Sequence, residues 1–294
     1  MSTAPITGAG RRRSFVAADW RTPKGAARYA VAIALVALAY YLAGRAGLEL
    51  AYLDGAVAAI WPPAGIGLAI LVLYGPWMVP GIVIGDLFLG DYSTPLGTVL
   101  AQTVGNTVAL VVAAWLFRRL TSGRVGLDRV FDVLAFFLCA LVAAIISAAF
   151  GPLALRLGGV IPADELAEVF RTWTLGDAAG VLVVAPAVLT WAAGGVRDVR
   201  RRDLVEAGVL LVILVLLAEI PPQRDVPYIV FPALLWAALR FGPRGAATAT
   251  LIVCSIAVWN TAQNSGPFVR DSLTNSLLST QLFIATAAIT SLLL

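Results

Sequence analysis

Two aspartates, Asp86 and Asp177, interrupt long apolar stretches of the sequence. Each is accompanied by a pair of glycines four residues apart, Gly81 with Gly85 and Gly176 with Gly180. An aspartate at mid-membrane costs about 3 kcal/mol to insert, so a carboxylate at that depth is a candidate for function. Glycines at this spacing let two helix backbones approach closely. We therefore expect both carboxylates to face other helices rather than lipid, at similar depths.

Other polar and aromatic side chains are predicted to lie in the same layer. Gln102 and Asn106 are four residues apart and share a helix face, as do Trp173 and Asp177. If these faces converge, they form an outward-facing pocket for a small ligand with a polar or cationic group. The predicted ligand-binding residues are Asp177, Asp86, Trp173, Asn106, Trp61 and Gln102. A later segment adds further polar groups at its outer end, namely Trp259, Asn260, Gln263 and Asn264.

Each of these residues also has a purely structural interpretation. The tryptophans could be anchors at the membrane interface, and Pro62-Pro63 could shape the start of a helix. Gln102 and Asn106 could hydrogen-bond to neighbouring helices. The two acids could pair with Arg45 or Arg171. For the acids, a functional role is favoured over a structural one.

The sequence contains no histidine and two cysteines. The absence of histidine excludes Ser-His-Asp and Cys-His catalysis, histidine-ligated metals and phosphohistidine chemistry. Cys139 and Cys254 lie in apolar runs and are interpreted as buried small side chains rather than a disulfide. A metal bound by Asp86 and Asp177 would need further acids at the same depth, and none is evident. We expect no enzymatic activity, no metal and no cofactor.

Composition predicts the elements that carry these residues. Of the 294 residues, 60% are hydrophobic and 13% charged, whereas soluble domains are about half apolar and about a quarter charged. Several charge-free stretches match the ~20 residues of a membrane-spanning helix. Gly75-Pro76 divides the second predicted span from the third, and Gly242-Pro243 divides the eighth from the ninth. The sequence predicts an all-α polytopic membrane protein with ten spans (eight as the fallback), at 28–46, 56–74, 76–91, 96–117, 130–152, 170–193, 204–220, 227–241, 244–263 and 273–294.

The basic residues favour one orientation of these spans. Cytoplasmic loops collect Lys and Arg, and with ten spans most of the 21 basic residues fall on one side. Both termini are therefore predicted to be cytoplasmic, with residues 1–27 as a basic tail and residues 28–294 as the membrane domain. The net charge of +4 is assigned to topology and to contacts with the lipid bilayer. No nucleic-acid partner is expected, because the chain lacks a basic soluble surface.

Three short motifs resemble the membrane-associated sensor family of the first MASE type, a sensory module of bacterial histidine kinases and diguanylate cyclases. They are Trp61-Pro62-Pro63-Ala64-Gly65, then Gly105-Asn106-Thr107 followed by Ala113-Ala114-Trp115-Leu116-Phe117-Arg118-Arg119, and Trp173-Thr174-Leu175-Gly176-Asp177-Ala178-Ala179-Gly180 running to Pro186 and Trp191. The resemblance extends from about residue 30 to the C-terminus. It implies a multi-pass sensor in the bacterial plasma membrane and leaves the ligand open.

The leading hypothesis is therefore a signal-input domain. A small ligand or membrane partner on the outer side would bias the packing of the third, fourth and sixth spans, and the last span would relay the change. The resemblance implies a cytoplasmic output domain, a histidine kinase or diguanylate cyclase, and the sequence contains no signature of either. We expect this module to be fused in a longer protein or docked. Another membrane protein and a second copy of the chain, in a homodimer, are further candidate partners.

The alternative function is a small-solute or proton-coupled transporter, because membrane carboxylates and short spans also serve transport. Against it, the polar groups cluster in the outer half and no acidic relay continues toward the cytoplasm. An intramembrane enzyme ranks below both hypotheses.

Overall fold

The computed structural model describes residues 22–49, 51–52, 57–193, 201–219 and 227–294. The long elements are all α-helices: α3 (Pro23–Glu49), α4 (Pro62–Tyr74), α5 (Val79–Leu89), α6 (Leu96–Leu120), α7 (Val130–Leu157), α8 (Leu166–Ala193), α9 (Arg201–Ala218), α10 (Phe231–Ala262) and α11 (Leu273–Leu293). Two short 3₁₀ helices, Pro76–Met78 and Pro227–Val230, precede α5 and α10. Strands β1 (Ala51–Tyr52) and β2 (Val57–Ala58) pair antiparallel. The predicted tail, residues 1–27, lies largely outside the described residues.

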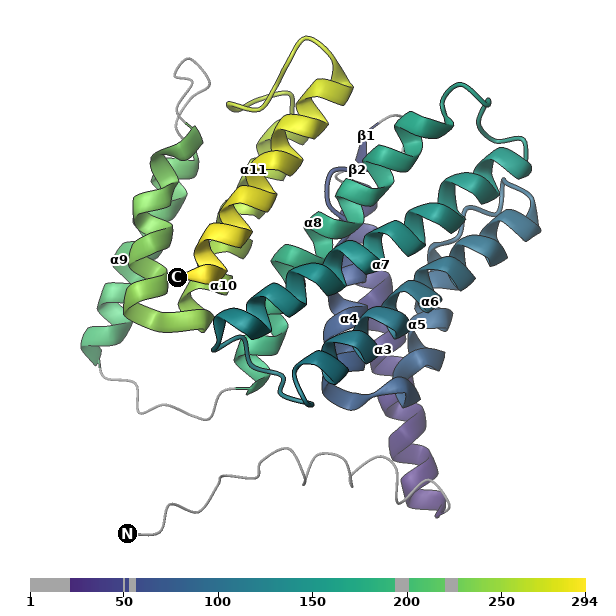
Figure 1. Cartoon of the computed structure of the whole chain (residues 1–294), viewed down its shortest axis with the longest axis horizontal. Helices are drawn as coiled ribbons and strands as arrows, with labels where there is room; N and C mark the ends of the chain where they lie inside the picture. Colours follow the sequence, from purple (N-terminus) through teal and green to yellow (C-terminus); the bar gives the residue numbers. More distant parts are fainter. Residues whose placement is uncertain (1–21, 50, 53–56, 194–200, 220–226) are drawn as a thin grey trace.

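Helix α8 stands between two groups of helices, with α3 to α7 on one side and α9 to α11 on the other (Figure 1). The buried apolar side chains form two clusters, one mainly in each group, and α8 contributes to both. Its Val181 and Leu182 belong to the first cluster, while Ala179 and Val183 belong to the second. Large apolar side chains also face outward, among them Phe88, which is 73% exposed. An apolar exterior around a packed interior is what a lipid environment requires.

Six helices in the described part of the chain are long and apolar enough to cross a membrane, so the chain is a multi-pass all-α protein apart from β1 and β2. Helices α4 and α5 are too short to do so. Their 13 and 11 residues reach roughly 20 and 17 Å at about 1.5 Å per residue, against a hydrocarbon core of about 30 Å. The chain breaks between them at Gly75, which has a φ of 87° that favours glycine.

Ten spans and a cytoplasmic position for both termini are not confirmed, because the described residues form nine α-helices. The predicted spans 227–241 and 244–263 fall mostly within a single element, α10, which is broken at Gly242 with a φ of 65°. A Cβ added to Gly245 would lie 2.5 Å from the carbonyl oxygen of Ala237. Eight residues of straight helix would separate these two residues by about 12 Å. Their close contact therefore shows that the chain folds back at Gly242.

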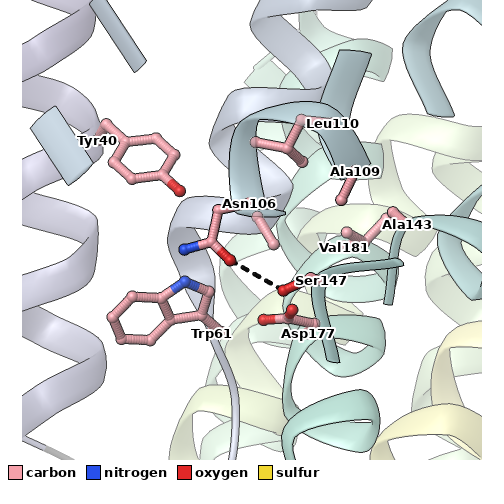
Figure 2. Close-up of a pocket in the computed structure, with 10 residues that line it drawn as sticks. Tyr40, Trp61, Asn106, Ala109, Leu110, Ala143, Ser147, Asp177 and Val181 are labelled. Carbon is pink, nitrogen blue, oxygen red and sulfur yellow. Dashed lines mark hydrogen bonds between the residues drawn. The ribbon is translucent and has the colours of Figure 1, made fainter. Parts of the chain in front are cut away.

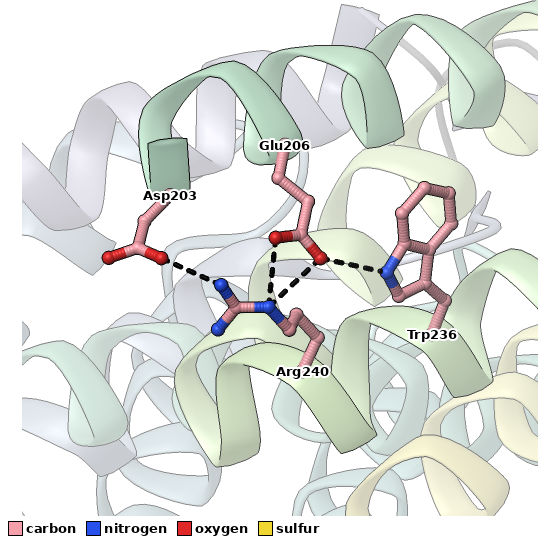
Figure 3. Close-up of polar contacts among 4 residues, drawn as sticks. All are labelled: Asp203, Glu206, Trp236 and Arg240. Carbon is pink, nitrogen blue, oxygen red and sulfur yellow. Dashed lines mark hydrogen bonds and ion pairs between the residues drawn. The ribbon is translucent and has the colours of Figure 1, made fainter. Parts of the chain in front are cut away.

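A cluster of charges fixes which faces of α9 and α10 meet (Figure 3). Arg240 on α10 donates from Nη2 to Asp203 at 2.7 Å and from Nε to Glu206 at 2.9 Å. Trp236 donates from its indole nitrogen to the same glutamate at 3.3 Å. Because Arg240 is 39% exposed, each ion pair contributes on the order of 0.2–1 kcal/mol. The cluster therefore sets the register of the two helices more than it stabilises them.

Glycines on α5 set how closely it approaches α3. A Cβ added to Gly81 would lie 2.8 Å from the carbonyl oxygen of Ile33, and one on Gly85 would lie 2.7 Å from that of Ala37. Any larger residue would push the two backbones apart. The prediction that the glycines beside Asp86 permit close helix packing is confirmed.

Candidate functional site

A chain of hydrogen bonds joins side chains from five helices. Tyr40 on α3 and Asn106 on α6 both donate to Oδ1 of Asp86 on α5, each at 3.1 Å. Ser147 on α7 donates to the amide oxygen of Asn106 at 2.9 Å. Trp173 on α8 donates from its indole nitrogen to the Ser147 hydroxyl at 3.0 Å. The chain therefore runs continuously from α3 through α5, α6 and α7 to α8.

Asp177 lies beside this chain of hydrogen bonds and faces a small cavity that Tyr40, Asn106 and Ser147 also line (Figure 2). It lies close to Ser147 on the wall of that cavity, and near enough to Asp86 for the two carboxyl groups to interact electrostatically. Both acids are withdrawn from the surface, with Asp86 6% and Asp177 5% exposed. Thr103 on α6 is also buried and lies close to Asp86. The two aspartates thus meet among polar side chains and face away from the lipid-exposed surface.

The cavity at this site is small. Its volume is about 10 Å³, and its walls carry the side chains of Tyr40, Trp61, Ala64, Asn106, Ala109, Leu110, Ala143, Ser147, Asp177 and Val181. That volume accommodates about one water molecule. A larger ligand would enter only if the helices around the cavity moved apart.

Backbone contacts between α4 and α8 hold Trp61 at the cavity. The amide of Trp61 donates to the carbonyl oxygen of Gly176 at 2.9 Å. A Cβ on Gly180 would overlap the carbonyl oxygen of Trp61, and one on Gly65 would overlap that of Gly180. Pro62 and the proline after it lack N–H groups, so the start of α4 leaves fewer donors unsatisfied. The glycines around Asp177 therefore permit the backbones of α4 and α8 to touch.

Five of the six predicted ligand-binding residues come together here: Asp86, Asp177, Trp173, Asn106 and Trp61. Gln102 is half-buried one turn before Asn106 and does not line the cavity. The predicted polar groups at the end of α10 do not line it either, and Trp259 is 56% exposed.

Three polar residues of the site around Asp86 were not predicted from the sequence: Tyr40, Thr103 and Ser147. Each is an uncharged polar residue inside an apolar stretch, and this is the signal that could have identified it. The structural alternative, in which an acid pairs with Arg45, does not describe the site. Arg45 instead contacts Glu49 at 3.1 Å, one turn along its own helix.

A buried glutamine connects the site to α11. Gln281 is 3% exposed and donates from Nε2 to the carbonyl oxygens of Ala59 at 3.3 Å and Thr172 at 3.5 Å. Ala59 lies two residues before Trp61, and Thr172 immediately precedes Trp173. The last helix is therefore attached to the two segments that position these tryptophans.

Replacing Ser147 by alanine is expected to destabilise the domain by about 2 kcal/mol, because Asn106 and Trp173 each lose a buried hydrogen-bond partner. Unfolding of the purified protein in detergent measures the change. Thr174→Ala is the matched control, since that hydroxyl bonds to Phe170 on its own helix. In a double-mutant cycle with Trp173→Phe, the coupling should be about 1 kcal/mol. A coupling of zero would show that the bond between Trp173 and Ser147 is absent.

The fold and the site together define the class: a multi-pass α-helical membrane protein with a polar network buried among its helices. Residues 31–294 match the sequence profile of MASE1. The chain belongs to the MASE1 family of membrane sensor domains, which are sensory rather than catalytic and are associated with signalling output domains. No curated protein and no solved structure matches the chain significantly. Within the described ranges, no group of three or more acidic or cysteine side chains could hold a metal ion.

Proposed function

We propose that this chain is the signal-input domain of a sensor in the bacterial plasma membrane. A small ligand or a membrane partner on the outer side would act on the site around Asp86 and Asp177. The observation that carries this proposal is the hydrogen-bond chain from Tyr40 to Trp173, which spans five helices. A change at one member must alter the partners of the next, so a local event is transmitted between helices.

The size of the cavity supports a sensor that changes state. A ligand can shift an equilibrium between two packings only by its differential affinity for them. Because the cavity of about 10 Å³ accommodates about one water molecule, a larger ligand binds only to a packing in which the helices have separated. Binding and repacking are then the same event. A membrane partner would act similarly by favouring one arrangement of the outer helix ends.

The relay runs from the site through Gln281 to α11 and then to a cytoplasmic output domain. This output is a histidine kinase or a diguanylate cyclase, either fused to the sensor or docked to it. The contacts of Gln281 with Ala59 and Thr172 support this route, since both residues adjoin the tryptophans of the site. A homodimer of the membrane domain would let paired α11 helices position two output domains.

Gln281→Leu in a fusion to a diguanylate cyclase reporter is expected to change basal output by about fivefold or more, because two hydrogen bonds that hold α11 are lost. Thr286→Ala is the control on the same helix, since its exposed hydroxyl bonds only to its own helix at Leu282. Cyclic dinucleotide production per folded protein is the measurement. Output equal to the parent in both variants would contradict a relay through Gln281.

Transport is the alternative function, and the two neighbouring buried carboxylates favour it, because such groups carry ions and protons in transporters. Solute or proton uptake into liposomes distinguishes the two functions. A transporter would show uptake that Asp177→Asn abolishes. A sensor would show none above empty liposomes.

A further inference from the structure

A groove opens between α4 and α6 at the end of these helices remote from the candidate site. It has a volume of about 420 Å³, within the range of about 300–1,000 Å³ that is usual for small-molecule sites. Its walls are formed by Leu71, Pro76, Val111, Ala114, Trp115, Arg118 and Arg119. Arg118 lies twelve residues along α6 from Asn106, which is about 18 Å of helix. The groove is therefore separate from the cavity at Asp177.

The groove combines an apolar floor with two guanidinium groups at one end. Leu71 and Ala114 are buried, whereas Trp115 is 64% exposed and forms an outer wall. Arg118 is held in place by a bond from Nη1 to the carbonyl oxygen of Val72 at 3.3 Å. Arg119 is exposed beside it in the last turn of α6. Guanidinium groups bind phosphate oxygens with suitable geometry and charge.

Aromatic residues mark the depth of this end of the groove. Tyr74 and Trp77 are 49% and 55% exposed and lie near the break at Gly75. Tyrosine and tryptophan concentrate where hydrocarbon meets the headgroup region. At that depth, the material outside an apolar groove is acyl chain, and the material beside the arginines is headgroup phosphate.

We propose that this groove binds one anionic phospholipid, with its phosphate on Arg118 and Arg119 and an acyl chain along Leu71, Val111 and Trp115. Charge complementarity selects an anionic headgroup over a zwitterionic one, because the groove presents two positive charges. The helix dipole and membrane topology also favour basic residues in the last turn of α6, but neither requires an open apolar groove beside them.

The test measures lipid binding by the purified full chain and is independent of any signalling role. Delipidated protein in detergent is titrated with phosphatidylglycerol or phosphatidylcholine of identical acyl chains, and bound lipids are counted by native mass spectrometry. We expect phosphatidylglycerol to bind at least about fivefold more tightly. Arg119→Gln should remove most of this preference. Arg129→Gln, which removes an exposed arginine outside the groove, should preserve it.

The apolar part of the groove is tested with lipids brominated on their acyl chains. Brominated phosphatidylglycerol should quench the fluorescence of the parent protein more than that of Trp115→Phe, because Trp115 lines the groove. Equal affinity for both lipids would overturn the proposal. So would an equal loss of preference in Arg119→Gln and Arg129→Gln, or quenching unchanged by removal of Trp115.

Discussion

Gly180→Ala is expected to destabilise the membrane domain by about 3 kcal/mol, the largest effect on stability of any substitution considered. The added methyl group would overlap the carbonyl oxygen of Trp61, and neither backbone can rotate away as a side chain could. Helices α4 and α8 would have to separate, which also breaks the bond from the Trp61 amide to Gly176. Thermal unfolding in detergent should show a clear decrease in melting temperature.

Gly208→Ala provides the matched control. Gly208 lies within α9, and a Cβ added to it would meet nothing within 4 Å. Replacing an unconstrained helical glycine by alanine should stabilise the helix by about 0.5–1 kcal/mol. The two substitutions should therefore have opposite signs. If Gly180→Ala were as stable as the parent, the backbone contact between α4 and α8 would be wrong.

Asp86→Asn and Asp177→Asn are expected to have the largest effect on signalling. Asparagine keeps the volume of aspartate but replaces a carboxylate oxygen with an NH₂ group. At Asp86, Tyr40 and Asn106 both donate to Oδ1. Asparagine can keep these two bonds only with its NH₂ group in the place of Oδ2, which turns that acceptor into a donor beside the chain. A buried polar group left without a partner costs about 1–3 kcal/mol, and about 1.4 kcal/mol corresponds to a tenfold shift of a two-state equilibrium. Basal output of a cyclase fusion measures the shift.

Asp91→Asn is the control, because it also replaces an aspartate by asparagine but lies outside the buried site around Asp86 and Asp177. Asp91 is exposed in the loop after α5, and the Ser93 side chain and amide hold the pKa of its carboxyl below the usual value. It is therefore ionised at neutral pH, and its replacement removes a full charge outside the hydrogen-bond chain. Output should remain within twofold of the parent. The sensory proposal fails if both buried aspartates tolerate asparagine with folding and output unchanged.

Sequence patterns predicted the residues whose position in a membrane is expensive or sterically demanding. Asp86 and Asp177 were identifiable because a carboxylate in an apolar stretch needs partners. Their flanking glycines were identifiable because close helix contact requires the absence of a side chain. The Gly242-Pro243 pair likewise located the point where the chain folds back within α10, although ten spans are not confirmed.

Uncharged polar residues could not be placed in the same way. Ser147 and Gln281 have many equivalents in apolar helices, and their importance depends on which helix faces them. Asp132 lies near the start of the predicted span 130–152, yet it is 2% exposed and forms an ion pair with Arg124 at 3.0 Å. Such contacts depend on how helices are arranged around one another. The charge pattern of one sequence constrains the depth of a residue but not its neighbours in the bundle.

The most direct test of coupling between the site and the output is a double-mutant measurement in a cyclase fusion. Asp177→Asn is introduced into the parent and into the Gln281→Leu variant, and basal output is measured in all four proteins. If Gln281 carries the change to α11, Asp177→Asn should alter output at least tenfold in the parent and less than twofold in Gln281→Leu. An equal effect of Asp177→Asn in both backgrounds would contradict this route from the site to the output.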